Sequence, residues 1–129
     1  MGIKNRVALI TGSASGMGKQ TALRMAENGA KVVINDIVPE KVESTVSEFK
    51  KAGFDVIGQV ADICKKKEVE AMVKAAVDAF GSIDILVNNA GMEKAGILRK
   101  LTEEAWDITI KVNLKRGVFV QSGRPWLYG

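Results

Sequence analysis

The chain alternates between short apolar runs and longer segments in which apolar residues recur with helical spacing. The apolar runs are rich in Val, Ile and Leu, which is typical of strands buried on both faces of a sheet. We expect strands at residues 6–11, 31–36 and 83–88, with a weaker candidate at 55–61. We expect helices between them at residues 16–28, 39–51 and 65–80. Each helix is followed by a glycine in the position where a left-handed cap is favourable, namely Gly29, Gly53 and Gly81.

Strands that alternate with helices of this length predict parallel pairing through right-handed crossovers. The expected fold class is α/β, a Rossmann-like doubly wound parallel sheet, truncated to about four strands and four helices. In the usual order, the third strand lies outside the second, the second lies beside the first, and the fourth lies on the far side of the first. Ligands bind where this order reverses, between the first and fourth strands.

A fourth helix is expected from about residue 102 to 120, with Thr102 as N-cap and Glu103 and Glu104 in its first turn. Its apolar stripe is too broad for a helix with a single neighbour. We expect residues 1–120 to form one domain and residues 121–129 to form an atypical C-terminal tail.

The composition is that of a folded domain, with 129 residues of which 47% are hydrophobic and 26% charged. No apolar stretch is long enough to span a membrane, and the single cysteine, Cys64, excludes an internal disulfide. These features predict a cytoplasmic protein with no membrane partner. The net charge is +4, and a positive charge of this size indicates nucleic-acid binding only when the basic residues form one patch. Lys and Glu alternate in segments such as KKKEVEAMVK, which is typical of a solvated surface. We therefore expect no nucleic-acid partner.

The segment TGSASGMG, residues 11–18, follows the first apolar run and precedes the first helix. Such a turn directs backbone N–H groups and the positive end of a helix dipole to one point, which favours an anion. Gly12 is expected to make the turn, Gly16 to allow close approach of a pyrophosphate, and Gly18 to let the helix pack. Ser13 and Ser15 are candidate hydroxyl donors to phosphate or ribose.

The same segment has other possible interpretations. A mononucleotide P-loop requires Gly at position 13 and Ser or Thr at position 20, where the chain has Ser13 and Gln20. A methyltransferase-like fold that binds an adenosine sulfonium cofactor also uses a glycine loop and stays open as a weaker alternative. A turn with no ligand stays open as well.

Asp36 ends the second apolar run, at about the 20-residue spacing after the glycines that is typical of a ribose-binding carboxylate. Such a carboxylate accepts hydrogen bonds from the ribose 2′-hydroxyl of NAD and repels the extra phosphate of NADP. The expected cofactor is therefore NAD, with NADP less favoured. The alternative is that Asp36 caps the next helix.

With these motifs the chain resembles the short-chain dehydrogenases/reductases. The resemblance rests on TGSASGMG, on NNAG at residues 88–91 and on VNLKRGVF at residues 112–119, in this order and at these spacings. It covers residues 3 to about 120. The resemblance implies a dinucleotide-dependent oxidoreductase.

The resemblance also assigns roles to particular residues of this chain. The pyrophosphate loop would comprise Gly12, Ser15, Gly16, Met17 and Gly18, with Asp36 at the ribose. The remaining assignments are Asp62 and Ile63 at the adenine, Asn89, Ala90 and Gly91 beside the nicotinamide ribose, and Asn113 in the proton relay.

The family's catalytic Tyr, followed four residues later by Lys, has no counterpart here. The chain contains one tyrosine, Tyr128, which is followed by Gly129. An unassisted phenol is a poor acid at neutral pH. We therefore expect Asn113 to be the one catalytic position present, in an incomplete site. A nucleophilic role for Cys64 and a metal site are not supported, because the chain has no histidine.

These features leave two functions open for an NAD(H)-binding chain. One is an oxidoreductase chain truncated before its Tyr and Lys, for which autonomous hydride transfer is not expected. The other is a non-catalytic dinucleotide-binding or oligomerisation module. An open edge at the strand 83–88 predicts a homo-oligomer formed through the fourth helix, this edge or both, or pairing with full-length relatives.

Overall fold

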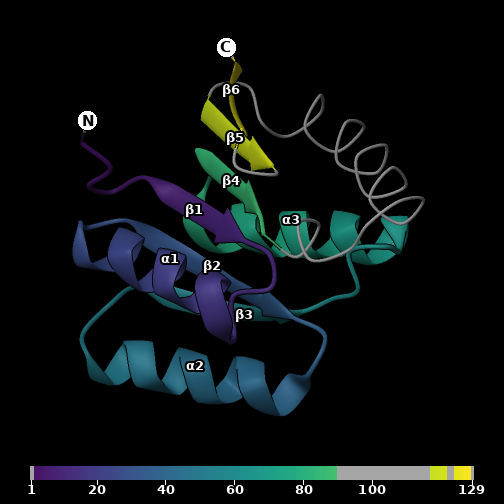
Figure 1. Cartoon of the computed structure of the whole chain (residues 1–129), viewed down its shortest axis with the longest axis horizontal. Coiled ribbons are helices and arrows are strands. Elements are labelled where there is room, and N and C mark those ends of the chain that lie inside the picture. Colours follow the sequence, from purple (N-terminus) through teal and green to yellow (C-terminus); the bar gives the residue numbers. More distant parts are fainter. Residues whose placement is uncertain (1, 90–116, 122–123, 129) are drawn as a thin grey trace.

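A computed structural model describes residues 2–89, 117–121 and 124–128 of the chain. Their helices are α1 (Gly16–Glu27), α2 (Pro39–Lys51) and α3 (Lys66–Phe80). Their strands are β1 (Val7–Ile10), β2 (Lys31–Asp36), β3 (Val56–Val60), β4 (Ile85–Asn88), β5 (Gly117–Gln121) and β6 (Arg124–Tyr128). Figure 1 shows the strands side by side as one twisted sheet.

The sheet has the order β3-β2-β1-β4-β5-β6. All neighbouring pairs from β3 through β2, β1 and β4 to β5 are parallel, and β6 pairs antiparallel with β5. The order reverses between β1 and β4, because the chain moves outward from β1 to β3 and then crosses to the other side of β1. The predicted order of the first four strands and the predicted switch point are therefore confirmed.

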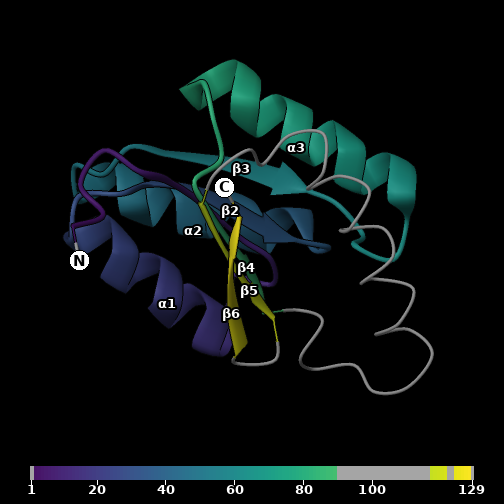
Figure 2. The ribbon, with the colours of Figure 1, turned by 90° about the horizontal axis from the view of Figure 1, so that it is seen from above.

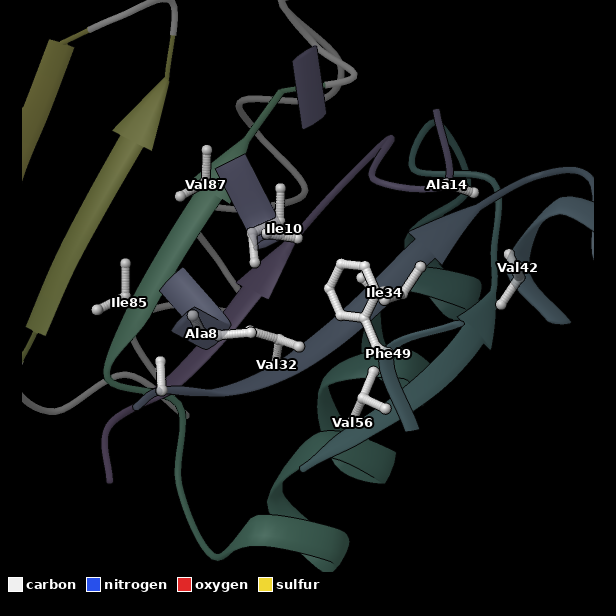
Figure 3. Packing of buried hydrophobic residues seen from close by; sticks show 13 residues of the cluster. Ala8, Ile10, Ala14, Val32, Ile34, Val42, Phe49, Val56, Ile85 and Val87 are labelled. Carbon is white, nitrogen blue, oxygen red and sulfur yellow. The ribbon is translucent and has the colours of Figure 1, made fainter. Parts of the chain in front are cut away.

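Helices cover both faces of the sheet. Figure 2 shows α3 on one side of the strands and α1 on the other. Alternate residues of each strand face opposite layers: Leu9 and Val33 pack with α3, whereas Ala8 and Val32 pack with α1 and α2. In Figure 3 the ring of Phe49 from α2 lies against the α1 and α2 face of β2 and β3. This burial on both faces explains why the strands are continuous apolar runs.

The first three predicted helices and the four predicted strands are confirmed, with shifts of one or two residues at their ends. The predicted left-handed glycines are confirmed too, since φ is 94° at Gly29, 89° at Gly53 and 87° at Gly81. Within the described residues no helix is long and apolar enough to cross a membrane.

The end of the predicted fourth helix is wrong. Residues 117–120 belong to strand β5, while residues 102–116 lie outside the described part of the chain. Val118, Phe119 and Val120 are β-branched or aromatic and favour a strand when a neighbouring strand is available. The available neighbour is β4, since Leu86 is in register with Phe119.

This pairing also corrects the prediction of an open edge at β4. Strand β4 lies between β1 and β5, so its edge is not available to a second copy. Strands β5 and β6 extend the sheet beyond the four strands expected from the sequence. The boundary predicted after residue 120 falls inside β5.

Candidate functional site

The glycine loop, residues 11–15, lies at the carboxyl end of β1, between the carboxyl ends of β2 and β4. This is the switch point of the sheet, where open α/β proteins bind their ligands. The site is built from this loop, the first turn of α1, and the residues that follow β2, β3 and β4.

Hydrogen bonds fix the loop to β2. The Gly12 N–H donates to Asn35 Oδ1 at 3.3 Å, and the Ser13 N–H donates to the Asn35 carbonyl at 2.7 Å. The Ser13 hydroxyl donates to the Ile10 carbonyl at 2.7 Å and accepts the Asn35 N–H at 2.9 Å. Ser13 is fully buried, so the prediction that its hydroxyl serves a phosphate or ribose is wrong. The hydroxyl instead satisfies two backbone groups inside the fold.

On its other side the loop is fixed to β4. The Thr11 N–H donates to the Val87 carbonyl at 2.9 Å, and the Thr11 hydroxyl donates to Asn88 Oδ1 at 2.9 Å. Asn89, which follows β4 and is buried, donates from Nδ2 to the Gly12 carbonyl at 3.3 Å. The loop therefore has a defined position relative to both neighbouring strands.

Gly16 and Gly18 have different surroundings. At Gly16 φ is 57°, and a Cβ built there would meet no atom within 4 Å, so the space beside it is open. A Cβ on Gly18 would overlap the Gly12 carbonyl oxygen and lie 2.7 Å from Asn89 Nδ2. Gly16 thus leaves room for an incoming group, whereas Gly18 allows the first turn of α1 to pack against the loop and the end of β4.

The first turn of α1 has the features of an anion site. Ser15 is the N-cap, with extended backbone, and its hydroxyl makes no capping hydrogen bond. The turn contains no acidic residue, and the N–H groups of residues 16–18 have no partner within the helix, as at any helix start. Ser15 is exposed, and the Met17 side chain is 72% exposed.

Asp36 is half-buried at the end of β2, next to this turn. Its carboxylate accepts the Ile37 N–H at 2.9 Å and the Ala14 N–H at 3.4 Å. Helix α2 has Val38 as its N-cap and no side-chain cap, so the alternative in which Asp36 caps that helix is wrong. The carboxylate lies at the glycine loop and has capacity for further donors.

Asp62 and Ile63 follow β3 and form the third part of the site. Asp62 Oδ1 accepts the Cys64 N–H at 2.9 Å, and the Asp62 N–H donates to Glu68 Oε1 at 3.0 Å. The Ile63 side chain is buried in the core beneath α3, so only its backbone can face a ligand. The turn that carries Asp62 is therefore well defined.

The remaining predicted residues, Ala90, Gly91 and Asn113, lie outside the described residues. Among the described residues there is no cluster of three or more His, Cys, Asp or Glu side chains that could hold a metal ion.

Two residues outside the sequence motifs named above, Asn35 and Thr45, also contact the loop. Asn35 is polar within a strand that is otherwise buried and apolar, and it is 1% exposed. Thr45 of α2 is buried and donates its hydroxyl to the Ala14 carbonyl at 3.3 Å. A polar residue inside an apolar strand requires hydrogen-bond partners, and that signal is visible in VVIND.

The sheet order, with a glycine-rich turn at its switch point, defines a Rossmann-type α/β protein. The chain matches the family model described as short chain dehydrogenase over residues 6–123. The chain belongs to that family.

Curated relatives include a (2S)-[(R)-hydroxy(phenyl)methyl]succinyl-CoA dehydrogenase subunit, BbsD, from Thauera aromatica. It is 70% identical over 120 residues, which are 93% of this chain and 48% of the relative. A 3-oxoacyl-[acyl-carrier-protein] reductase, FabG, from Staphylococcus epidermidis is 42% identical over 89% of this chain and 47% of its own length. The chain thus spans about half the length of the curated relatives it matches.

Solved structures of the family have the same fold. A short chain dehydrogenase/reductase from Burkholderia phymatum in complex with NAD has a TM-score of 0.78 and 28% identity, covering 88% of this chain and 45% of that one. A 2-keto-3-deoxy-D-gluconate dehydrogenase from Streptococcus agalactiae has a TM-score of 0.72 and 33% identity, covering 91% of this chain and 50% of that one.

Proposed function

We propose that these residues form the NAD(H)-binding half of a short-chain dehydrogenase/reductase. The observation that carries the proposal is the juxtaposition of the open first turn of α1 with the Asp36 carboxylate, which accepts the Ala14 N–H at 3.4 Å. The turn offers N–H groups to a pyrophosphate, and the carboxylate offers acceptors to the neighbouring ribose. The space beside Gly16 accommodates a bound phosphate, which a side chain there would hinder.

Asp36 supports NAD rather than NADP. Ser15 in the glycine loop and Ile37, which follows Asp36, are uncharged, so neither supplies the cation that a ribose 2′-phosphate requires. Lys19, the nearest lysine in α1, is paired with Glu48 at 3.2 Å. A carboxylate without a neighbouring cation attracts the two ribose hydroxyls and repels an additional phosphate.

We propose that the adenine binds at Asp62 and Ile63, which follow β3, and that it also reaches the end of β2. Ile37 and Val60, at these ends, are large apolar side chains with exposures of 59% and 50%. Asp62 and the backbone of Ile63 would bind the polar edge of the base, and Ile37 and Val60 offer apolar surface to its ring. Asn89, Ala90 and Gly91 would lie toward the nicotinamide end, with Asn113 in the proton relay.

Calorimetric titration with NADH, NADPH and S-adenosylmethionine tests this assignment. We expect NADH to bind most tightly, and preference for the sulfonium cofactor would favour the methyltransferase alternative. Asp36→Ala should weaken NADH binding by roughly 10- to 100-fold, because hydrogen bonds to a charged group are worth about 1.5–3 kcal/mol. It should weaken NADPH binding less.

Asp36→Asn is the matched control for this titration. It keeps an oxygen for the Ala14 N–H and removes the charge, so it should narrow the preference for NADH over NADPH with little effect on the loop. Equal losses of NADH and NADPH affinity in Asp36→Ala would contradict the ribose assignment.

These 129 residues contain no Tyr followed four residues later by Lys. In the family that pair supplies the proton that accompanies hydride transfer, so we propose that the described site binds the cofactor and that reduction of a carbonyl requires residues beyond these. The chain alone should therefore show no turnover of NADH with a panel of ketones. Measurable turnover would contradict this part of the proposal.

For the complete enzyme we propose an acyl thioester substrate. Both relatives described above are named for thioesters, one of coenzyme A and one of acyl carrier protein. A chimera in which residues 1–120 replace the matching part of the Thauera relative tests whether this half is compatible with a thioester dehydrogenase, and it should oxidise that relative's substrate with NAD. A folded, NADH-binding chimera without this activity would contradict the proposal.

Self-association stays a prediction. The edge of β4 is not available for it, so a homo-oligomer would use the segment predicted as the fourth helix, or another edge of the sheet. Light scattering at micromolar concentration tests it, and a clean monomer would contradict it.

A further inference from the structure

Asn35 is a buried polar residue at the centre of the candidate site. It lies between Ile34 and Asp36 in β2 and is 1% exposed. It is in register with Gln59 of β3, so its side chain lies near the carboxyl end of that strand. Burial of an amide costs free energy unless its donors and acceptor are all satisfied.

The oxygen of the Asn35 amide binds the glycine loop. Oδ1 accepts the Gly12 N–H at 3.3 Å. The backbone of Asn35 adds two hydrogen bonds to Ser13, one through its N–H and one through its carbonyl. One residue of β2 thus sets the position of the turn in front of α1.

The nitrogen of the same amide binds the end of β3. Nδ2 donates to the Gln59 carbonyl at 3.1 Å and to the Ala61 carbonyl at 3.2 Å. Ala61 directly precedes Asp62. The orientation of the amide is unambiguous, since two carbonyls face its nitrogen and one N–H faces its oxygen.

We propose that Asn35 is a positioning residue that sets the separation between the glycine loop and the Asp62 turn. The inference rests on the proposed function, in which one dinucleotide spans both segments, with its pyrophosphate at the loop and its adenine at the turn. An amide of this length is required, because the position needs one acceptor for the Gly12 N–H and two N–H donors for the Gln59 and Ala61 carbonyls. An Asp side chain has no N–H donor, and an Ala side chain has neither a donor nor an acceptor.

Ligand binding by Asn35→Ala and Asn35→Asp tests the proposal. ADP-ribose contains the pyrophosphate that would bind the glycine loop, whereas adenosine has no phosphate and would contact only Asp36 and the Asp62 turn. We expect Asn35→Ala to weaken ADP-ribose binding about tenfold, which corresponds to about 1.4 kcal/mol of binding free energy. Adenosine binding should fall by less than about threefold, because adenosine does not depend on the separation.

Asn35→Asp separates the two sides of the amide. It keeps an acceptor for the Gly12 N–H but places a carboxylate oxygen against the Gln59 and Ala61 carbonyls. It should weaken ADP-ribose binding to a similar degree as Asn35→Ala. Wild-type affinity in Asn35→Asp, or equal losses for ADP-ribose and adenosine in Asn35→Ala, would overturn the proposal.

Phe49→Leu serves as the control for general loss of stability. Phe49 is 1% exposed, packs on Phe54 with ring centroids 6.0 Å apart, and belongs to the core on the α1 and α2 face of the sheet, and its hydrocarbon side chain forms no hydrogen bond with the glycine loop or the Asp62 turn. The variant should lower the unfolding midpoint in urea without changing the ratio of ADP-ribose to adenosine affinity. If Phe49→Leu changed the ratio of ADP-ribose to adenosine affinity, this ratio would reflect general stability and not the separation of the two segments. That result would overturn the proposal.

Amide hydrogen exchange of the ligand-free protein separates this inference from the proposed function. Asn35→Ala should raise exchange at Gly12 and at Ala61 together, whereas Phe49→Leu should not. Unchanged exchange at either amide would overturn the role of Asn35, whether or not the wild type binds a dinucleotide. Absence of NADH and ADP-ribose binding by the wild type would instead overturn the proposed function.

Discussion

The two serines of the glycine loop flank Ala14 and have opposite surroundings. Ser13 is buried, and its hydroxyl bridges the Ile10 carbonyl and the Asn35 N–H. Ser15 is exposed, and its hydroxyl does not cap α1. The first hydroxyl therefore belongs to the fold and the second is available to a ligand.

This contrast predicts different effects of removing each hydroxyl. Ser13→Ala leaves a buried N–H without its acceptor and should lower the free energy of unfolding by about 1–3 kcal/mol. Ser15→Ala should change it by less than about 0.5 kcal/mol, as for other surface substitutions. It should weaken NADH binding roughly 3- to 10-fold, the equivalent of one hydrogen bond.

Urea unfolding and NADH titration of both variants check this prediction. Equal stability of the two variants would show that the buried hydroxyl contributes nothing to the fold. Unchanged NADH affinity in Ser15→Ala would remove Ser15 from the phosphate site.

At the residue scale, the sequence predicted which segments meet at the site but not the partner of each polar group. The spacing of Gly12, Gly16, Gly18 and Asp36 is a local pattern, and the structure brings these residues together at the switch point. The role of the Ser13 hydroxyl depends on Asn35, which is distant in sequence and adjacent only after the strands have paired. Such a partner cannot be obtained from spacing.

At the scale of elements, the predictions succeeded where the local pattern and the sheet agree. β1, β2 and β4 are apolar because both of their faces are buried, so their composition alone identifies them. Residues 117–120 were predicted as helix from an apolar stripe, but their pairing with β4 determines their conformation. A strand that forms through a neighbour distant in sequence is not encoded in its own periodicity.

Strand β5 covers β4, so its removal should have a defined effect. A chain that ends at residue 116 leaves Ile85–Asn88 without the strand that pairs with it. We expect a lower unfolding midpoint in urea and concentration-dependent association by light scattering, because an apolar strand with an open edge recruits other strands. A chain that ends at residue 121 keeps β5 and should have an unfolding midpoint closer to that of the full chain. Identical behaviour of all three chains would contradict a contribution of β5 to the sheet.

At the scale of the whole molecule, the glycine loop connects three strands. It continues β1, and it is hydrogen-bonded to β2 through Asn35 and to β4 through Asn89 and Thr11. A ligand held by this loop would therefore stabilise the centre of the sheet as well as the loop itself. Binding and global unfolding should be linked.

Thermal unfolding with and without NADH measures this linkage. A ligand present at one hundred times its Kd adds about 2.7 kcal/mol to the free energy of unfolding. For a chain of this size the corresponding increase in Tm is on the order of 10 °C. Asp36→Ala should show a smaller increase at the same NADH concentration, because it binds less of the ligand. An unchanged Tm in the wild type at saturating NADH would contradict binding at the loop.

The outermost strands of the described sheet, β3 and β6, offer different backbones to another molecule. β6 contains Pro125, opposite Val120 of β5, and proline has no N–H group. An edge strand tolerates proline when the missing donor faces away from its partner, so the outer side of β6 is interrupted at that residue. Val56–Val60 of β3 contains no proline. Lengthening of the sheet from one molecule to the next should therefore be easier at β3 than at β6.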